Sequence, residues 1–366
     1  MDPLFTILRE VRDPREENAR HRLPDILFIA LAATLCGAKT CVEIAAFGQG
    51  NQETLTEWID LPHGAPSHDT FSRVFRLLDP LELERALVAF MTALRQGLGL
   101  PAPAGVVALD AKSLRRGYER GQAHVAPLMI SLWDSQTRLA LAAGRVRMNE
   151  SDDALDLLRS LDLKGCTLTA DALHCHPAMA EAVLAAKADD AITLKRNNGP
   201  LHQAAEEAFA QAAAPARFEA SQTGHGRVER RLAEVVTLPT RHPARARMPG
   251  LKAFGRIQAE RRRADSAPET ATRYVALSRP CSPERLLDTM RQHWSIENQS
   301  HWVLDVVFRE DEARSRKDHA PENLAVIRRI AHGLLSAHPV KDTMTGKIRR
   351  AMWSKDFFLS IFTHMR

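Results

Sequence analysis

Two aspartates follow short apolar runs in a way that could support metal-dependent chemistry. Asp110 follows the run VVAL at residues 106–109, and Asp171 follows TLTA at residues 167–170. An ionised carboxylate at the end of a buried strand must be paired, hydrogen-bonded or bound to a metal ion. Two such carboxylates at one sheet edge repel each other unless a divalent cation neutralises them, and oxygen ligands suit Mg²⁺ or Mn²⁺. Taken singly, each aspartate is more often a capping or turn residue than a ligand.

A third acid, Glu297, lies in the helical-period segment MRQHWSIENQSHWVLDVVF at residues 290–308. His293 and His301 stand four residues to either side of it, so the three share one face of a regular helix and leave zinc binding as an alternative. Such a site usually needs further ligands from elsewhere. The segment HCH at 174–176 is a second zinc alternative, because alternate residues of a strand share a face, although no CxxC pair lies near it.

The elements that must position these acids fall into two groups. Residues 1–98 show apolar residues at three-to-four spacing, which predicts an all-helical N-terminal domain, and GLGLPAPAG at 97–105 predicts a linker. Short apolar runs then alternate with helical segments, which predicts an α/β fold with a mixed sheet and flanking helices. Strands are expected at residues 106–112, 124–133, 139–148, 166–173, 189–195, 227–238 and 272–278, and helices at 151–161, 177–187, 200–213 and 283–308.

Composition and length exclude several classes of protein. The chain has 366 residues, 45% of them apolar and 26% charged, as in globular proteins of more than one compact unit. Five cysteines form no disulfide framework, so we expect a reducing cytoplasm. The N-terminus carries charges throughout and predicts no signal peptide. The longest apolar stretch, residues 26–36, is well short of the roughly 20 residues that span a membrane, so we expect no membrane insertion.

Basic residues gather in one part of the chain. Between residues 215 and 263 there are twelve Arg or Lys and four Glu, whereas the whole chain has a net charge of only +5. A focused basic segment is typical of a protein that follows a phosphate backbone, and a solvated β-rich insertion explains the charge equally well. Arg227, Arg230 and Arg231 alternate with apolar residues there and are hypothesised backbone contacts.

Further basic residues follow the other motifs. Lys112, Lys195 and Arg196 each come just after a predicted strand segment that carries or neighbours an acid, and are candidate DNA contacts. For Lys112, an ordinary surface lysine is the alternative interpretation. A second candidate patch, RSRK at 314–317, follows Glu310 and Asp311, two acids that could be auxiliary ligands but are better explained by salt bridges to nearby arginines.

Six blocks of sequence, read in order, resemble the motif series of the H-repeat-associated insertion-sequence transposases, a bacterial branch of the DDE superfamily. The resemblance implies a ribonuclease-H-like catalytic domain over residues 105–330 with a β-rich insertion at about 215–280. A helical N-terminal domain over 1–98 would help bind DNA or a partner, and a C-terminal helical tail would span 331–366. The blocks are HGAPSHDTFSRVFRLLDP (63–80), VVALDAKSLRR (106–116), TLTADALHCH (167–176), AITLKRNNGPL (191–201), HGRVERR (225–231) and RQHWSIENQSHWVLDVVFREDEARSR (291–316).

The resemblance also implies roles for the acids. Asp110, Asp171 and Glu297 correspond to the catalytic and metal-binding triad, which would hold two Mg²⁺ or Mn²⁺ ions about 4 Å apart for in-line displacement at phosphorus. Asp110 would bridge both ions. The family usually has glycine where this chain has Ala111, a change that matters only if the backbone there has a positive φ.

The expected partners are the element's terminal inverted repeats, target DNA and a second copy of the chain in a synaptic homodimer, in the bacterial cytoplasm at the nucleoid. Two other functions stay open. A catalytically idle descendant would keep the fold and bind DNA without strand transfer. A metal-dependent nuclease would use the same three acids on other nucleic acids.

Overall fold

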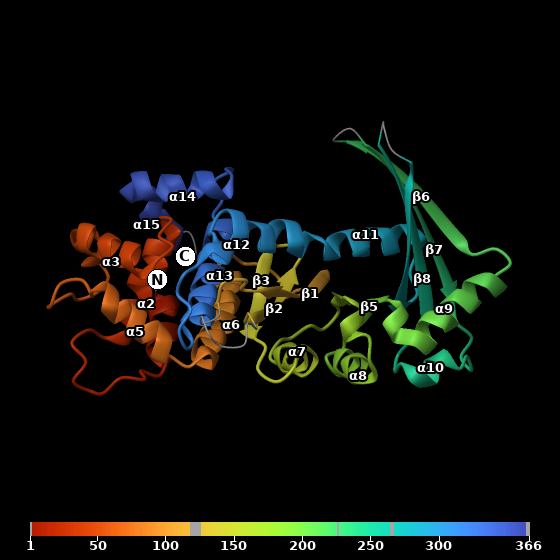
Figure 1. Ribbon diagram of the computed structural model, residues 1–366, viewed down its shortest axis with the longest axis horizontal. Helices are drawn as coiled ribbons and strands as arrows, with labels where there is room; N and C mark the ends of the chain where they lie inside the picture. The colour runs from red at the N-terminus through yellow and green to blue at the C-terminus, as the bar shows by residue number, and fades with distance from the viewer. Residues whose placement is uncertain (1, 118–125, 225–226, 264–266, 364–366) are drawn as a thin grey trace.

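The computed structural model describes residues 2–117, 126–224, 227–263 and 267–363. The molecule is elongated, with a helical region at one end, a sheet flanked by helices in the middle and long β-strands at the other end (Figure 1). The α/β class with an N-terminal helical region is therefore confirmed.

The helical region combines both ends of the chain. Buried side chains from residues 4–98 and from residues 303–362 form one apolar core, in which Phe28 contacts Trp58 and Phe362. Helix α13 (Ala320–Ala337) runs through this core and is buried along most of its length, so the expected boundary between residues 330 and 331 falls inside a helix. The other helices here are α1 (Asp2–Glu10), α2 (Leu23–Leu35), α3 (Cys41–Gly50), α4 (Gln52–Leu55), α5 (His68–Leu77), α6 (Pro80–Gly97), α14 (Met344–Trp353) and α15 (Lys355–Thr363).

Nine strands form one mixed sheet within the described residues, in the order β3-β2-β1-β4-β5-β9-β8-β7-β6. In its first five strands, β2 runs antiparallel to β1 and β3, whereas β4 and β5 run parallel to β1. This arrangement is the ribonuclease-H-like sheet that the family resemblance implies. The five strands are β1 (Val106–Ser113), β2 (Leu128–Asp134), β3 (Leu139–Arg145), β4 (Thr167–Ala170) and β5 (Asp189–Leu194). Residues 124 and 125 of the second predicted strand lie outside the described residues.

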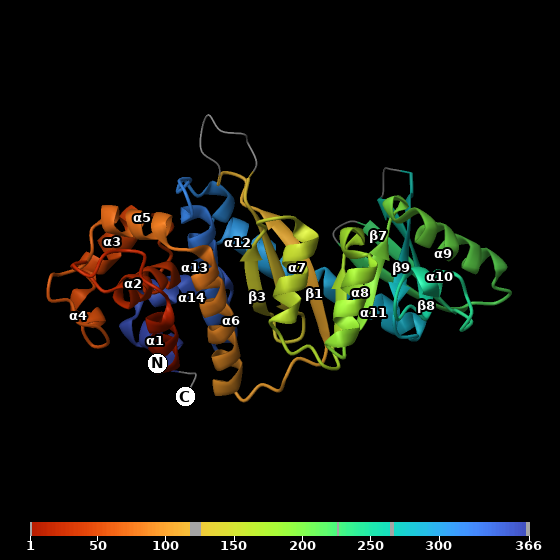
Figure 2. The ribbon, with the colours of Figure 1, turned by 90° about the horizontal axis from the view of Figure 1, so that it is seen from below.

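Helices cover both faces of this sheet. Helices α7 (Glu150–Arg159) and α8 (Pro177–Ala185) lie on one face, where Leu109, Ile130 and Leu168 point into an apolar core (Figure 2). Helix α11 (Pro283–His293) crosses the opposite face, where Ile296 just beyond its end packs against Ala108 and Trp133. This burial on both faces explains why the central strands are nearly continuous apolar runs in the sequence.

The insertion continues the same sheet. Its strands pair antiparallel with one another, and β9 pairs with β5 at the edge of the first five strands. The sequence predicts two of these strands but misses β6 and β8. The strand β6 is exposed along almost its whole length and lacks the apolar alternation that marks a half-buried strand, whereas in β8 the buried residues near its start give way to a run of charged residues. The elements are β6 (Ala216–Gly224), β7 (Arg227–Thr237), β8 (Ala253–Arg263) and β9 (Glu269–Leu277), with α9 (Gly199–Gln211) before them and α10 (Ala244–Arg247) between β7 and β8.

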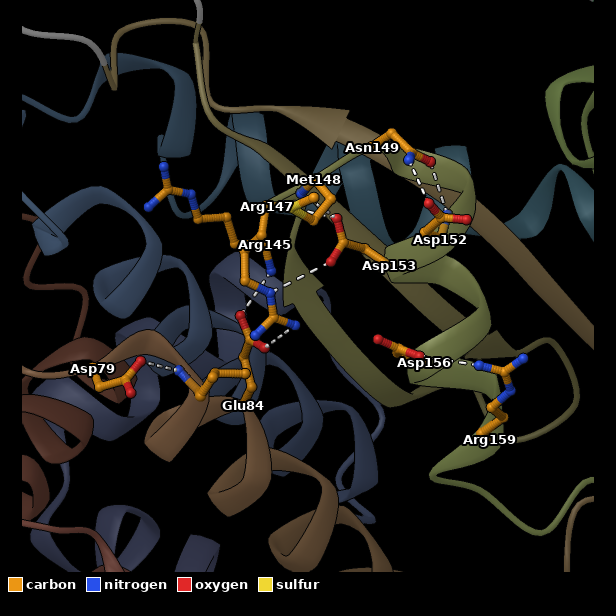
Figure 3. Close-up of polar contacts among 11 residues, drawn as sticks. Asp79, Glu84, Arg145, Arg147, Met148, Asn149, Asp152, Asp153, Asp156 and Arg159 are labelled. Atoms are coloured by element: carbon orange, nitrogen blue, oxygen red, sulfur yellow. Dashed lines mark hydrogen bonds and ion pairs between the residues drawn. The ribbon is translucent and has the colours of Figure 1, made fainter.

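A buried carboxyl joins the helical region to the sheet. Glu84 of α6 accepts a 2.8 Å hydrogen bond from the backbone N–H of Arg145 at the end of β3, and its other oxygen lies 3.6 Å from Arg147 (Figure 3). Asp153 of α7 accepts from the backbone N–H groups of Arg147 and Met148. The loop after β3 is thereby held between α6 and α7.

Candidate active site

The sheet brings Asp110 and Asp171 to neighbouring positions. The parallel register of β1 and β4 pairs Ala108 with Thr169, and each aspartate follows two residues later. Side chains two residues apart share a face of the sheet, and neighbouring strands lie about 4.8 Å apart. The register therefore directs both carboxylates to the sheet face that α11 crosses.

Glu297 comes to the same place because the helix that carries it is fixed to that face. The ring nitrogen Nδ1 of His293 lies 3.0 Å from Thr169 Oγ1 of β4, and the indole N–H of Trp133 donates to Ser295 Oγ at 3.2 Å. Glu297 follows Ser295 by two residues. The helix bearing the third acid is thus tied to β4, which precedes Asp171, and to β2, which pairs with the strand that carries Asp110.

The predicted regular helix over 283–308 widens at Glu297. Residues Glu297–His301 form a π-helical turn, in which the N–H of Trp302 donates to the carbonyl of Glu297, before α12 (Trp302–Val306) resumes. Single π turns inside α-helices occur frequently at functional sites. The turn also changes the four-residue spacing on which the zinc alternative for this helix depends.

The three acids line one cavity of about 270 Å³ together with several cations. Lys195 contributes a cation from the end of β5, and its ammonium nitrogen lies 3.3 Å from Asp171 Oδ2. The cavity therefore combines three carboxylates with a basic wall, as a site for a polyanion held against metal ions requires. The remaining cations on its lining are Arg231 of β7, Arg273 of β9 and Arg291 of α11.

Asp110 experiences the charge of its neighbours directly. Burial, followed by the negative charges of Glu297 and Asp171, raises the pKa of Asp110 to about 6 even though its carboxylate accepts from the N–H of Ala111. His301 Nδ1 lies 3.5 Å from Asp110 Oδ2. Burial and the charges of Arg329 and Lys112 lower the pKa of His301 to about 4, so this imidazole is neutral at pH 7 and does not offset the negative charge.

The donor set of the cavity suits a hard divalent cation. Three carboxylates that repel one another are stabilised by Mg²⁺ or Mn²⁺. Within the described ranges, no three His, Cys, Asp or Glu side chains already stand close enough together to hold an ion. The acids share the cavity without closing on one point.

Neither zinc alternative forms a cluster in the described part of the chain. The residues HCH lie in a 3-10 turn (Ala172–His174) and at the start of α8, not on a strand. His174 lies 3.3 Å from Glu150, whereas His176 caps α8 by accepting from the N–H of Met179. Both histidines therefore have local structural partners.

The residues predicted to contact DNA differ in exposure and in distance from the cavity. Lys195 and Arg231 line the cavity, and Arg196 is exposed in the 3-10 turn (Arg196–Asn198) next to it. Arg230 is exposed but forms a hydrogen bond with Glu219 across the hairpin. The backbone of Arg227 belongs to β7, and its side chain lies outside the described residues.

The expectation that Lys112 contacts DNA phosphate is wrong in this structure. Its side chain is only 7% exposed, and its ammonium nitrogen lies 2.6 Å from Asp305, 2.9 Å from Asp311 and 3.4 Å from Glu310. Glu310 in turn bonds to Arg329 of α13 at 3.0 Å. Lys112 is thus the centre of a buried ionic network behind the cavity, and Glu310 and Asp311 are salt-bridged as the sequence suggests, though to other cations.

Sequence reasoning missed three further residues of the site. Arg273 lies with its guanidinium 4.8 Å from the ring centre of Trp294, and Arg291 lies beside it on the lining. Glu150, at the start of α7, adds its charge to those that raise the pKa of Asp110. Arg291 could have been predicted from the sequence, because it stands six residues before Glu297. Arg273 could not, because only the order of strands in the sheet places β9 beside the cavity.

None of the described helices has the length and apolar character needed to cross a bilayer.

Comparisons with known proteins agree with this arrangement. Residues 101–334 match the family described as Transposase DDE domain, and residues 5–91 match the family described as DDE_Tnp_1-associated. The chain is 30% identical over 360 residues to the H repeat-associated putative transposase YhhI of Escherichia coli (strain K12), covering 94% of this chain and 93% of that protein. It is 37% identical over 54 residues to a protein of the same strain named Inactive transposase YbfQ, covering 15% of this chain and 64% of that protein.

Among solved structures, the piggyBac transposase synaptic complex with hairpin DNA has a TM-score of 0.45 and 11% identity, covering 97% of this chain and 80% of that one. A likeness this distant carries no argument. The two family matches and the relatives covering most of the chain are decisive on their own: the chain belongs to the transposase DDE domain family.

Proposed function

We propose that this protein is an active, metal-dependent DNA transposase that cleaves and joins the ends of its element with Asp110, Asp171 and Glu297. The observation that carries the proposal is the lining of one cavity, where these three carboxylates meet the cations Lys195, Arg231, Arg273 and Arg291. Carboxylates alone would repel DNA. The surrounding cations supply the complementary charge that a phosphodiester needs to approach them.

Different residues of the cavity would bind the metal ions and the DNA. Asp110, Asp171 and Glu297 would bind Mg²⁺ or Mn²⁺, which when bound activates water or a DNA 3′-hydroxyl and stabilises the leaving oxygen. The raised pKa of Asp110 supports this role, because part of its cause is the negative charge of the other two acids. Arg231, Arg273 and Arg291 would hold the phosphates beside the scissile bond.

Neutral groups of the site keep the acids in position. His301 contacts Asp110 from one side without neutralising it, and the bond between His293 and Thr169 fixes the helix before Glu297. Since preorganised ligands lower the cost of assembling a metal site, these contacts favour catalysis over a purely structural role for the acids.

Activity on labelled terminal-repeat DNA with Mn²⁺ separates this proposal from the two alternatives. Cleavage at the element ends followed by joining to target DNA is the expected result. Nicking of any DNA without preference would instead indicate a metal-dependent nuclease. Binding of the ends without cleavage would indicate an idle descendant, a possibility given weight by the relative that is named inactive.

Isosteric variants test the three acids individually. Asp110→Asn, Asp171→Asn and Glu297→Gln should each reduce cleavage by several orders of magnitude and leave DNA binding intact, because each removes one charge and little volume. Asp156→Asn is the matched control, since Asp156 is an exposed acid on α7 that pairs with Arg159 away from the cavity. An acid whose variant cleaves as fast as the control has no catalytic role.

Bringing two element ends together generally calls for at least two protein chains, so we also propose a homodimer on DNA. Sedimentation of the protein with and without paired end DNA tests this directly. Two protein chains per pair of ends are expected in the complex.

A further inference from the structure

A second basic surface lies away from the cavity that holds the acids. A groove of about 760 Å³ runs between the N-terminal helices α3 and α5 and the segment 314–317, which leads from the acid-bearing helix to α13. Its lining includes four cations, namely Arg76 of α5 and Arg314, Arg316 and Lys317 of the segment. We refer to it as the interdomain groove, because residues 5–91 and 101–334 match different families.

Three of these cations have no acidic partner among the residues that the structure describes. Among the described residues, no carboxylate lies within 4.0 Å of a charged nitrogen of Arg314, Arg316 or Lys317, and the buried Nε of Arg316 has no hydrogen-bond acceptor. Arg76 bonds to Asp318 at 2.7 Å. Asp69 is the acid on the lining, and it lies 3.4 Å from the ring of His68.

The insertion has more arginines, but several of them have acidic partners. Arg230 pairs with Glu219, Arg256 with Glu234, and Arg261 with Glu229. Paired arginines of this kind must give up an internal contact before they can bind phosphate. Among the described residues, Arg314, Arg316 and Lys317 of the interdomain groove have no such contact to give up. Release of the solvent ions around such cations and around the phosphates is the main source of affinity for DNA.

The backbone around the groove adds to its positive potential. Helices α3 and α5, each of ten residues, begin at its edge after the capping residues Thr40 and Ser67. The N-terminus of a helix carries a partial positive charge and N–H groups that lack partners within the helix. Here the helix ends are an addition to the side-chain cations and favour the same ligand.

We propose that the interdomain groove binds the phosphate backbone of the transposon-end DNA outside the segment that enters the catalytic cavity. The proposal rests on the proposed function and extends it to a second contact on the same DNA. Duplex DNA carries one negative charge per roughly 1.7 Å, so a groove with several unpaired cations matches a continuous run of phosphates better than it matches a single anion. The N-terminal helices thereby share in holding the substrate.

The double variant Arg314→Ala with Lys317→Ala tests the groove. Each lost phosphate contact lowers the slope of log affinity against log salt by about 0.9, so the double variant should lose about 1.8 from the slope measured by fluorescence anisotropy on end DNA. Arg159→Ala with Arg285→Ala is the matched control, because both of those exposed arginines pair with acids on their own helices. The control should keep the wild-type slope.

A second variant adds a charge without removing any cation. Ser72→Glu puts a carboxylate on the α5 side of the groove and should weaken DNA binding at 50 mM salt at least tenfold. Hydroxyl-radical footprinting should show that both variants lose protection outside the cleavage site only. Wild-type slopes and footprints in both folded variants would overturn the proposal.

The outcome is separable from that of the proposed function. Slopes are measured without divalent metal, so they report on the groove whether or not the protein cleaves DNA. If the wild type cleaves end DNA and the groove variants bind as it does, the groove proposal alone fails. If the wild type binds through the groove but never cleaves with Mn²⁺, the proposed catalytic function alone fails.

Discussion

The ammonium nitrogen of Lys112 lies 2.6 Å from a carboxylate oxygen of Asp305, although 193 residues separate the two in the chain. Lys112 is two residues beyond Asp110 on β1, and Asp305 belongs to the helix that follows Glu297. Burial opposes the charge of Lys112, but the surrounding carboxylates more than compensate and raise its pKa. The contact therefore holds the strand of the first acid against the helix of the third.

Substituting Lys112→Met should destabilise the protein by about 3–5 kcal/mol, because it leaves three carboxylates without their buried partner. Cleavage should fall even at temperatures where the variant stays folded, whereas the salt dependence of DNA binding should not change. Urea unfolding and anisotropy measure the two effects. A salt slope lowered by about 0.9 would restore the phosphate contact that the sequence suggested for Lys112.

Removing Lys195 should have opposite effects on metal and on DNA. The ammonium of Lys195 competes with a metal ion for Asp171, and since both side chains are substantially exposed, the pair contributes at most about 1 kcal/mol. Lys195→Ala should bind Mn²⁺ up to about fivefold more tightly in the absence of DNA, yet bind DNA more weakly. Calorimetric titration with Mn²⁺ provides the check, with Arg196→Ala as the neighbouring control. Weaker Mn²⁺ binding would mean that Lys195 does not compete for Asp171.

The buried carboxyl of Glu84 should make stability depend on pH. Burial raises its pKa to about 7, well above its value in an unfolded chain. The folded protein therefore keeps this proton between about pH 4.5 and 7 while the unfolded chain releases it, and stability falls as the pH rises through that range. As the pH rises from 5 to 8, the free energy of unfolding of Glu84→Gln should increase by up to about 3 kcal/mol relative to that of the wild type.

Denaturant unfolding at several pH values measures that difference. Glu82→Gln serves as the control, because Glu82 lies on the same helix and interacts with the exposed arginines Arg12 and Arg85. If the free energies of unfolding of Glu84→Gln and the wild type differed by the same amount at every pH between 5 and 8, Glu84 would be ionised throughout that pH range.

Gly255 sets the distance between α11 and the insertion. A Cβ atom at this position of β8 would lie 2.6 Å from Leu286 Cδ2 of α11, closer than non-bonded carbon atoms approach. Gly255→Ala should therefore cost about 1–3 kcal/mol and reduce cleavage more than DNA binding, because α11 leads directly to Glu297. Adding Leu286→Ala should restore part of the lost cleavage. Equal losses in the single and double variants would show that the two residues do not determine the position of the helix.

The sequence predicts the first five strands of the sheet well because burial on both faces leaves a strong signal. Runs such as VVAL and TLTA identify β1 and β4, and the acid that follows each run lies at the sheet face of the cavity. Glu297 is found by its motif. What its periodicity cannot show is the π-helical turn, because a single widened turn is too short to be recognised from the spacing of apolar residues along the sequence.

The features that could not be predicted from the sequence all depend on contacts between distant segments of the chain. Lys112 looks like a surface lysine until the carboxylates of residues 305–311 are brought around it. The strand β8 carries so many arginines that only its pairing with β7 and β9 identifies it. The shared core of residues 4–98 and 303–362 is invisible for the same reason, since each half alone is an ordinary set of amphipathic helices.

That shared core constrains how the protein can be made. Domains generally fold in order as the ribosome releases them, but helices α2 and α6 must wait for α13, which emerges more than two hundred residues later. Until then their apolar faces stay uncovered. A chain truncated after residue 308 would retain Asp110, Asp171 and Glu297 but lack α13, which covers the apolar faces of α2 and α6. The native helical core can therefore form only after α13 has been synthesised.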